Sequence, residues 1–246
     1  MRILIVGATG PTGQEVVRQA LDYGHNVKVL ARNPDKLNVP QPSPNLEVIH
    51  GDVFKLEDVK GALTGCDAIL SALGGKPGLF TACDVYSKSY DVILKAMKEL
   101  SVNRFITVTS WGTQDDPELP YLWRWVFKPS LLRNVVADMV VMEDKLLKEE
   151  GINWTVVKPP RLMDHPLTGV APLTMEGQLV RGIPGKTHIG RADLAKFMLD
   201  CLTTPQWDRK LVAICSAACA AVADGKDAGD MASVGNSVDG DKMGDK

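Results

Sequence analysis

Residues 2–21 read RILIVGATGPTGQEVVRQAL: an apolar run rich in β-branched residues, a glycine-rich turn and a segment of helical periodicity. A strand, a glycine turn and a helix in this order are typical of a binding site for the diphosphate of a dinucleotide. Gly7 permits the tight turn, Gly10 leaves room for the anion, and Gly13 lets the helix pack closely against the strand. The free N–H groups at the start of the helix then face the anion. The other predicted contacts in this turn are Thr9, Pro11 and Thr12. A plain strand-to-helix turn is the alternative interpretation.

The residue that follows the second predicted strand indicates which dinucleotide binds. That strand is Asn26–Ala31, and Arg32 comes directly after it, where NAD-selective sites usually carry a carboxylate for the ribose 2′-hydroxyl. A guanidinium can hold a 2′-phosphate through parallel charge-assisted hydrogen bonds. The sequence therefore predicts NADPH or NADP as the cofactor, with a solvated surface arginine as the alternative for Arg32.

Composition places the chain among ordinary globular proteins. Of its 246 residues, 45% are hydrophobic and 24% are charged, and the net charge of −2 gives no reason to expect nucleic acid or a membrane as a partner. The five cysteines include no Cys-x-x-Cys pair, which favours a reducing compartment. The first predicted strand begins at residue 2, and no apolar run approaches the roughly 20 residues of a membrane helix. We therefore expect a cytoplasmic protein without a signal peptide or a membrane span.

Strands and helices alternate along the chain and predict an α/β fold. Further strands are expected at 46–50, 67–73, 104–109, 154–158 and 211–215, with helices near 56–63, 86–100, 131–150 and 191–202. Such alternation is typical of a doubly wound parallel sheet, the Rossmann architecture, with helices on both faces. We expect one domain over residues 1–215, with a small C-terminal lobe on the substrate side. Residues 216–246 contain no aromatic side chain and predict a disordered low-complexity tail.

The loops after the predicted strands supply the remaining candidate site residues. In an open parallel sheet, ligands bind at the carboxyl ends of the strands. In strand order, the candidates are Asp52 and Val53, then Leu73 and Gly74, then Ser110, and finally Pro159 with Arg161. The first pair is expected to meet the adenine, the second the ribose or the diphosphate, and Ser110 the nicotinamide. Ordinary strand-to-loop turns are the alternative interpretation for each of them.

Several stretches match a known family, namely residues 7–13, 29–32, 51–53, 109–110, 159–160, 164–169 and 196–204. Through them the chain resembles the atypical short-chain dehydrogenase/reductases of the NAD(P)-binding, NmrA-like type, and among these the biliverdin-IX-beta reductases, also called NADPH flavin reductases. The resemblance implies a monomer that uses NADPH to reduce flavins (FMN, riboflavin) and certain linear tetrapyrroles. It also implies that Arg32 holds the 2′-phosphate and that Ser110 lies beside the nicotinamide. The chain departs from this family at Arg161 and near Met139–Val140, where the family has histidines, and in the loop after Ser110.

The chemistry that these residues support is hydride transfer to a conjugated acceptor. Ordinary short-chain dehydrogenases use a Tyr-x-x-x-Lys pair for proton transfer, and this chain contains no such pair. A conjugated acceptor delocalises the incoming charge, so the protein mainly has to hold it against the nicotinamide. Ser110 is the predicted catalytic residue, as a hydrogen-bonding group that orients the reactants.

Aromatic residues crowd the segment 111–127, which leaves the sheet at the nicotinamide end. A flat aromatic substrate stacks well on such rings, and basic side chains nearby could meet its phosphate or propionate groups. The candidates are Trp111, Tyr121, Trp123, Trp125 and Phe127 for stacking, and Arg124, Lys128 and Arg161 for the charge. The alternative is that these rings pack as a lid against the core.

Other functional classes find less support. The four histidines are scattered without metal-ligand spacing, so no metal is expected, and no Gly-x-Ser-x-Gly turn indicates a serine hydrolase. Two alternatives to a flavin or biliverdin reductase stay open. One is a non-catalytic NmrA-like protein that senses the NADP redox state, and the other is an NADPH-dependent reductase of a quinone or an enone.

Overall fold

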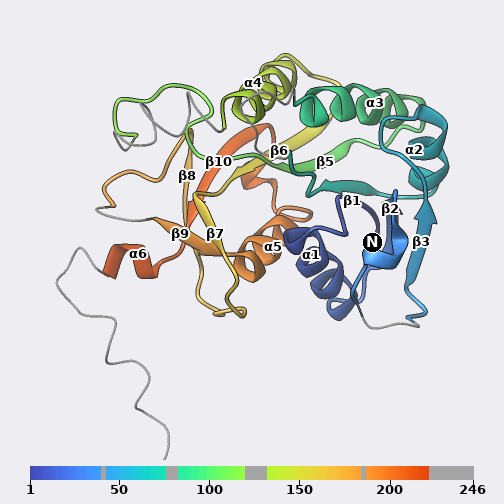
Figure 1. Ribbon diagram of the computed structural model, residues 1–246, viewed down its shortest axis with the longest axis horizontal. Coiled ribbons are helices and arrows are strands. Elements are labelled where there is room, and N and C mark those ends of the chain that lie inside the picture. Colours follow the sequence, from blue (N-terminus) through green and yellow to red (C-terminus); the bar gives the residue numbers. More distant parts are fainter. Residues whose placement is uncertain (40–42, 76–82, 120–131, 184–186, 222–246) are drawn as a thin grey trace, which may run out of the picture.

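The computed structural model describes residues 1–39, 43–75, 83–119, 132–183 and 187–221. In this part of the chain, eight strands form one sheet in the order β3-β2-β1-β4-β5-β6-β10-β8 (Figure 1). Neighbouring strands are parallel except β8, which runs antiparallel to β10 at the edge. The strands are β1 (Arg2–Val6), β2 (Asn26–Ala31), β3 (Leu46–His50), β4 (Ala68–Ser71), β5 (Arg104–Val108), β6 (Asn153–Lys158), β8 (Leu173–Glu176) and β10 (Lys210–Cys215).

Helices cover both faces of this sheet (Figure 1). One face carries α1 (Pro11–Asp22) and α5 (Arg191–Asp200), and the other carries α2 (Leu56–Leu63), α3 (Val85–Glu99) and α4 (Arg133–Leu147). A separate apolar core fills the space between the sheet and each helical layer. The central strands are therefore buried from both sides, which explains their nearly continuous apolar sequences.

The strand order brings the predicted site residues to one place. From β1 the chain moves outward to β2 and β3, and then returns to the other side of β1 to form β4. In open α/β sheets a ligand binds beside the carboxyl ends of the strands at such a reversal. The predicted doubly wound parallel sheet is confirmed and each predicted strand is present, although several elements are shorter than predicted.

The C-terminal lobe contains elements that the sequence did not predict. β7 (Arg161–Met163) and β9 (His188–Gly190) form a second, two-stranded parallel sheet, and β8 adds the antiparallel edge. These strands have three or four residues, most of them partly exposed, and lack the buried apolar run by which the equally short β4 could be predicted. No helix among the described residues is long and apolar enough to cross a membrane.

The end of the described chain corrects the predicted start of the tail. Ala218–Ala221 form a short helix, α6, and Cys219 within it is buried. The ordered chain therefore continues past the predicted boundary at residue 215. Residues 222–246 lie outside the described residues, and disorder there stays a prediction.

Candidate functional site

The glycine-rich turn lies between the carboxyl ends of β1 and β4, at the point where the winding reverses. Gly7 has a φ of +76°, and a Cβ added to it would lie 2.5 Å from the carbonyl carbon and oxygen of Ala72 and 2.6 Å from Leu73 N. A Cβ on Gly13 would lie 2.2 Å from the Gly7 carbonyl oxygen. Only glycine fits these two positions, because the obstructing atoms belong to the backbone.

Helix α1 begins directly after this turn with its first N–H groups free of any capping side chain. Gly10 is the N-cap, and Pro11 occupies the first turn. In the part of the chain that the structure describes, no side chain accepts a hydrogen bond from the start of the helix. A Cβ on Gly10 would meet only the Gly7 carbonyl oxygen, at 3.4 Å, so this glycine is not closed in by the protein. Thr12 is buried, while the half-buried Thr9 accepts a hydrogen bond at its carbonyl from Gln14 Nε2 at 3.1 Å. The arrangement leaves a cradle of N–H groups suited to an anion.

Arg32 follows the last residue of β2 and is exposed. Within the described ranges, no hydrogen bond or ion pair joins its guanidinium to another side chain, whereas Arg18 on α1 is paired with Glu15 and Asp22. A guanidinium that no carboxylate neutralises is available for an anionic ligand. Its position at the end of β2 is the one from which a ribose 2′-substituent is read in this fold.

The third strand leads into a turn that is already hydrogen-bonded within the protein. The carboxylate of Asp52 accepts the Phe54 N–H at 3.1 Å through Oδ1, and the Asp52 N–H donates to Asp58 Oδ2 at 2.8 Å. Val53 is 8% exposed and packs in the core between the sheet and α2. Its contact with the adenine stays a prediction.

The loop after β4 is held by two residues that the sequence did not single out. The hydroxyl of Tyr86 accepts the Gly75 N–H at 3.3 Å, and burial raises the pKa of this phenol to about 12. The carboxylate of Asp138, on α4, accepts the Tyr86 N–H at 2.8 Å and the Ser87 N–H at 3.2 Å, at the start of α3. A Cβ on Gly74, by contrast, would have no neighbour within 4 Å among the described residues, which leave the backbone accessible there.

Ser110 lies at the end of β5, in a loop that backbone hydrogen bonds join to β6 and to the residue after it. The Thr109 N–H donates to the Val157 carbonyl at 3.0 Å, and the Trp111 N–H donates to the Pro159 carbonyl at 3.0 Å. Thr109 and Trp111 are buried, while Ser110 between them is partly exposed. The predicted catalytic hydroxyl is therefore accessible and set in a fixed backbone, beside Pro159, which directly follows β6.

The aromatic prediction needs a correction at Trp111. Its side chain is 6% exposed and packs against Leu179, Val180 and Cys219 in the core of the C-terminal lobe. A ring enclosed in this way offers no face to a substrate, so the alternative of core packing holds for Trp111. The other candidates for stacking lie outside the described residues, namely Tyr121, Trp123, Trp125 and Phe127. The basic candidates Arg124 and Lys128 lie there as well. Arg161 is exposed at the start of β7 and remains available as a cationic contact.

The sequence analysis also missed a buried pair of charged residues that contacts the loop of Ser110. Lys158 and Glu143 are both 0% exposed, and Lys158 Nζ lies 2.7 Å from Glu143 Oε1. The signal that could have revealed it is a charged residue within an apolar helical stripe. Glu143 shares that buried stripe of α4 with Met139, Met142 and Leu146.

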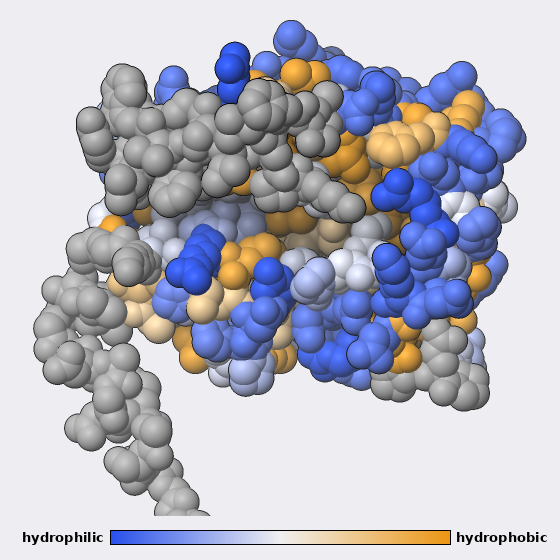
Figure 2. Space-filling view, viewed as in Figure 1, coloured by the Kyte–Doolittle hydropathy of each residue, from blue (hydrophilic) through white to orange (hydrophobic). Residues whose placement is uncertain are grey.

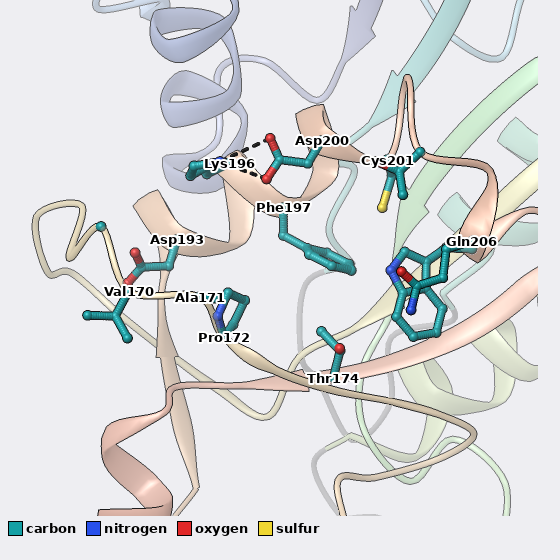
Figure 3. Close-up of a pocket in the computed structure, with 13 residues that line it drawn as sticks. Val170, Ala171, Pro172, Thr174, Asp193, Lys196, Phe197, Asp200, Cys201 and Gln206 are labelled. Atoms are coloured by element: carbon teal, nitrogen blue, oxygen red, sulfur yellow. Dashed lines mark hydrogen bonds and ion pairs between the residues drawn. The ribbon is translucent and has the colours of Figure 1, made fainter.

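The surface has two hollows, which lie in different parts of the molecule. The space-filling view shows a depression between the helical layers, with apolar residues at its floor (Figure 2). A second cavity, of about 410 Å³, lies between α5 and residues 169–174 and extends to the 3₁₀ helix η3 (Pro205–Trp207) (Figure 3). In it Phe197 and Trp207 contribute rings, and Lys196 is turned toward Asp200. None of the predicted cofactor residues lines this second cavity, so it is separate from the rim of the sheet.

Comparison with known proteins assigns the family. A family model described as NAD(P)H-binding matches residues 7–205. The chain belongs to this NAD(P)H-binding family. The match includes the glycine turn, Arg32 and the whole rim from Asp52 to Arg161. Within the described residues, no group of three or more His, Cys, Asp or Glu side chains is arranged to hold a metal ion.

Individual relatives of this NAD(P)H-binding protein carry different descriptions. An uncharacterized chloroplastic protein of Arabidopsis thaliana is 28% identical, over 87% of this chain and 76% of the relative. The photosystem II assembly factor Ycf39 of Cyanophora paradoxa is 29% identical over 64% of this chain, and the match spans 44% of that protein. A solved structure of a candidate NADH-flavin reductase from Streptococcus pneumoniae has a TM-score of 0.70 at 22% identity, covering 88% of this chain and 99% of that chain. This last likeness shows the fold alone.

The residues present fit the cofactor of the NAD(P)H-binding family. Backbone atoms take the space that a Cβ of Gly7 or Gly13 would fill, which keeps the turn tight. Among the described residues, no side chain competes with a diphosphate for the N–H groups at the start of α1. The glycine turn would hold the diphosphate, the loops after β3 and β4 would hold the adenosine, and Ser110 with Pro159 would flank the nicotinamide.

Proposed function

We propose that this protein is an NADPH-dependent reductase that transfers a hydride to flavins (FMN or riboflavin), and also to linear tetrapyrroles of the biliverdin type. The observation that carries the proposal is the composition of the rim. The carboxyl edge of the sheet carries the exposed Arg32, which has no carboxylate partner among the residues that the structure describes. It also carries the uncapped start of α1 and the partly exposed Ser110. The name of the Streptococcus pneumoniae structure is in keeping with this substrate class.

The chain's own residues bind and orient rather than supply a strong acid. Bound NADPH provides the hydride. The glycine turn and Arg32 anchor the two phosphate-bearing ends, while Ser110 donates a hydrogen bond that orients the nicotinamide carboxamide or the acceptor. Tyr86 is a poor proton donor, because burial raises the pKa of its phenol to about 12, and its oxygen already accepts the Gly75 N–H. The acceptor takes its proton from solvent.

A steady-state assay tests the assignment. NADPH oxidation, followed by its near-ultraviolet absorbance, is expected to depend on added FMN, riboflavin or biliverdin. A quinone and an enone belong in the same panel, because competition between acceptors separates a flavin reductase from a reductase of another conjugated electrophile. A folded protein that binds NADPH and reduces none of the panel would contradict the proposal.

Replacing Ser110 with alanine is expected to lower turnover by about 100-fold, the lower end of the range for losing one polarising hydrogen bond. The NADPH dissociation constant should stay nearly unchanged, because the glycine turn and Arg32 carry most of that affinity. Turnover by the variant gives the rate, and calorimetry gives the affinity. Ser101→Ala, an exposed serine before the amino end of β5, is the matched control. An unchanged rate in Ser110→Ala would remove Ser110 from the mechanism.

A second candidate function is a non-catalytic protein that binds NADP(H) and regulates a partner. The absence of a Tyr-x-x-x-Lys pair favours it, as does the description of the Cyanophora relative as an assembly factor. Binding of both NADP forms with no hydride transfer to any acceptor supports this alternative.

The remaining proposals concern the setting in which the protein works. All five cysteines are free, which is in keeping with a reducing compartment. We propose the cytoplasm, with a chloroplast as the alternative that the Arabidopsis relative suggests. We also propose that the protein acts as a monomer on a small, flat, conjugated substrate, without nucleic acid or membrane as a partner.

A further inference from the structure

A fully buried ion pair lies behind the loop of residues 109–113, which carries Ser110. Lys158 is the last residue of β6, directly before Pro159, and Glu143 lies on α4. Their charged groups are 2.7 Å apart, and neither side chain is exposed. The end of β6 and helix α4 therefore meet at this pair.

Glu143 binds both ends of the Ser110 loop, one with each carboxylate oxygen. Thr109 Oγ1 donates to Glu143 Oε1 at 2.7 Å, and Thr113 Oγ1 donates to Glu143 Oε2 at 2.7 Å. Lys158 Nζ donates to Thr113 Oγ1 as well as to Glu143. The two threonines are thereby fixed on a single carboxylate, with Ser110 between them.

The middle of the loop has its own backbone anchors. The Trp111 N–H donates to the Pro159 carbonyl at 3.0 Å, and the Gly112 N–H donates to the Gln178 carbonyl at 3.2 Å. With both ends held on Glu143 and the middle held on β6 and the C-terminal lobe, little freedom is left to Ser110. Its hydroxyl is the side-chain group of this loop that remains both polar and partly exposed.

Stability alone does not account for this pair. Removing two charges from water is costly, and apolar residues of similar volume often stabilise a core equally well or better. What an ion pair adds is direction, because each hydrogen bond fixes the angle as well as the distance between groups. A reacting hydroxyl benefits from such fixing, since small displacements lower the rate strongly.

We propose that Lys158 and Glu143 are positioning residues that fix the Ser110 loop for hydride transfer. This inference rests on the proposed reductase function and names residues that act on that site through Thr109 and Thr113. It predicts that the pair affects turnover rather than cofactor affinity.

The double variant Lys158→Met/Glu143→Leu tests the proposal, because it removes both charges together and leaves no unpaired ion. We expect it to fold with a Tm within about 5 °C of the wild type. NADPH affinity should change less than about threefold, while kcat falls about tenfold or more because the loop loses its fixed geometry. Hydrogen exchange of the amides in residues 109–113 should become faster, and exchange in β1 and α1 should not.

Two single variants keep the test decisive if the double variant fails to fold. Thr113→Val removes the hydroxyl that joins the loop to Glu143 and Lys158, and should lower kcat with faster loop exchange. Thr113→Ser keeps that hydroxyl and should retain both properties. Asp208→Asn is the matched control, since it weakens the ion pair of the buried Arg104 at the amino end of β5 (3.4 Å), away from Ser110. It should leave kcat and loop exchange unchanged.

The outcomes separate this inference from the function on which it rests. If the wild type reduces no acceptor, the proposed function fails, and loop exchange alone decides whether the pair fixes the loop. Unchanged loop exchange in the folded double variant, or in Thr113→Val, overturns the inference whatever the turnover. Unchanged turnover in a folded double variant of an active enzyme overturns it as well.

Discussion

Gly7→Ala is expected to abolish NADPH binding, the largest effect that we predict for any single substitution. The new Cβ would lie within 2.6 Å of three backbone atoms of Ala72 and Leu73, at a residue whose φ is +76°. These backbone atoms directly follow β4 and cannot swing away as a side chain could, so the chain after β4 must move away from the glycine turn where the diphosphate binds. We expect NADPH affinity to fall more than about 100-fold and the free energy of unfolding to fall by about 3 kcal/mol or more.

Gly24→Ala is the matched control for this prediction. Gly24 has nearly the same φ, +75°, but a Cβ added there would have no neighbour within 4 Å. It should therefore show only the conformational cost of a left-handed alanine, about 1–2 kcal/mol, and should bind NADPH normally. Urea unfolding measures the stability and calorimetry the affinity. If both variants behaved alike, the close approach of β4 to Gly7 would have no role in cofactor binding.

Arg32→Ala is expected to weaken NADPH binding by about 30- to 150-fold, which corresponds to about 2–3 kcal/mol for charge-assisted hydrogen bonds to a phosphate. NADH lacks the 2′-phosphate, so its affinity should change less than about twofold. The physical reason is that Arg32 is exposed and has no carboxylate partner among the described residues, so that its charge is free for the ligand. Titration calorimetry with each cofactor, at constant ionic strength, measures the two losses.

Arg18→Ala serves as the control for the charge itself. Arg18 is also an exposed arginine, but it lies on α1 and is paired with Glu15 at 2.5 Å and with Asp22 at 3.2 Å. Its removal should leave both dissociation constants nearly unchanged. Equal losses for NADPH and NADH in Arg32→Ala would mean that the 2′-phosphate is bound elsewhere.

The local part of the fold could be predicted from the sequence because its signals are local. The apolar run of β1, the glycines after it and the helical period of α1 lie within 21 residues, and each reflects short-range geometry. Alternation of strands and helices then leaves a doubly wound parallel sheet as the natural arrangement. The prediction that Arg32 contacts the cofactor rests on the same local reasoning, since in this fold the end of the second strand faces the ribose. β7, β8 and β9 could not be predicted, because they are short and mostly partly exposed, and they show neither a hydrophobic period nor a buried apolar run.

Burial and long-range pairing were decided only by the tertiary structure. Trp111 has a ring that suits a substrate or a core equally, and only its neighbours in the C-terminal lobe show that it is buried. Asp138 accepts hydrogen bonds from the start of α3, 52 residues away in the chain, and Glu143 accepts one from Thr109, 34 residues away. Their place in the apolar stripe of α4 indicates burial, but it does not indicate these partners. The sequence by itself determined the nucleotide-binding half of the molecule, where residues close in the chain act together. The tertiary structure decided what supports Ser110, because side chains far apart in sequence become neighbours only when the sheet and its helices have packed.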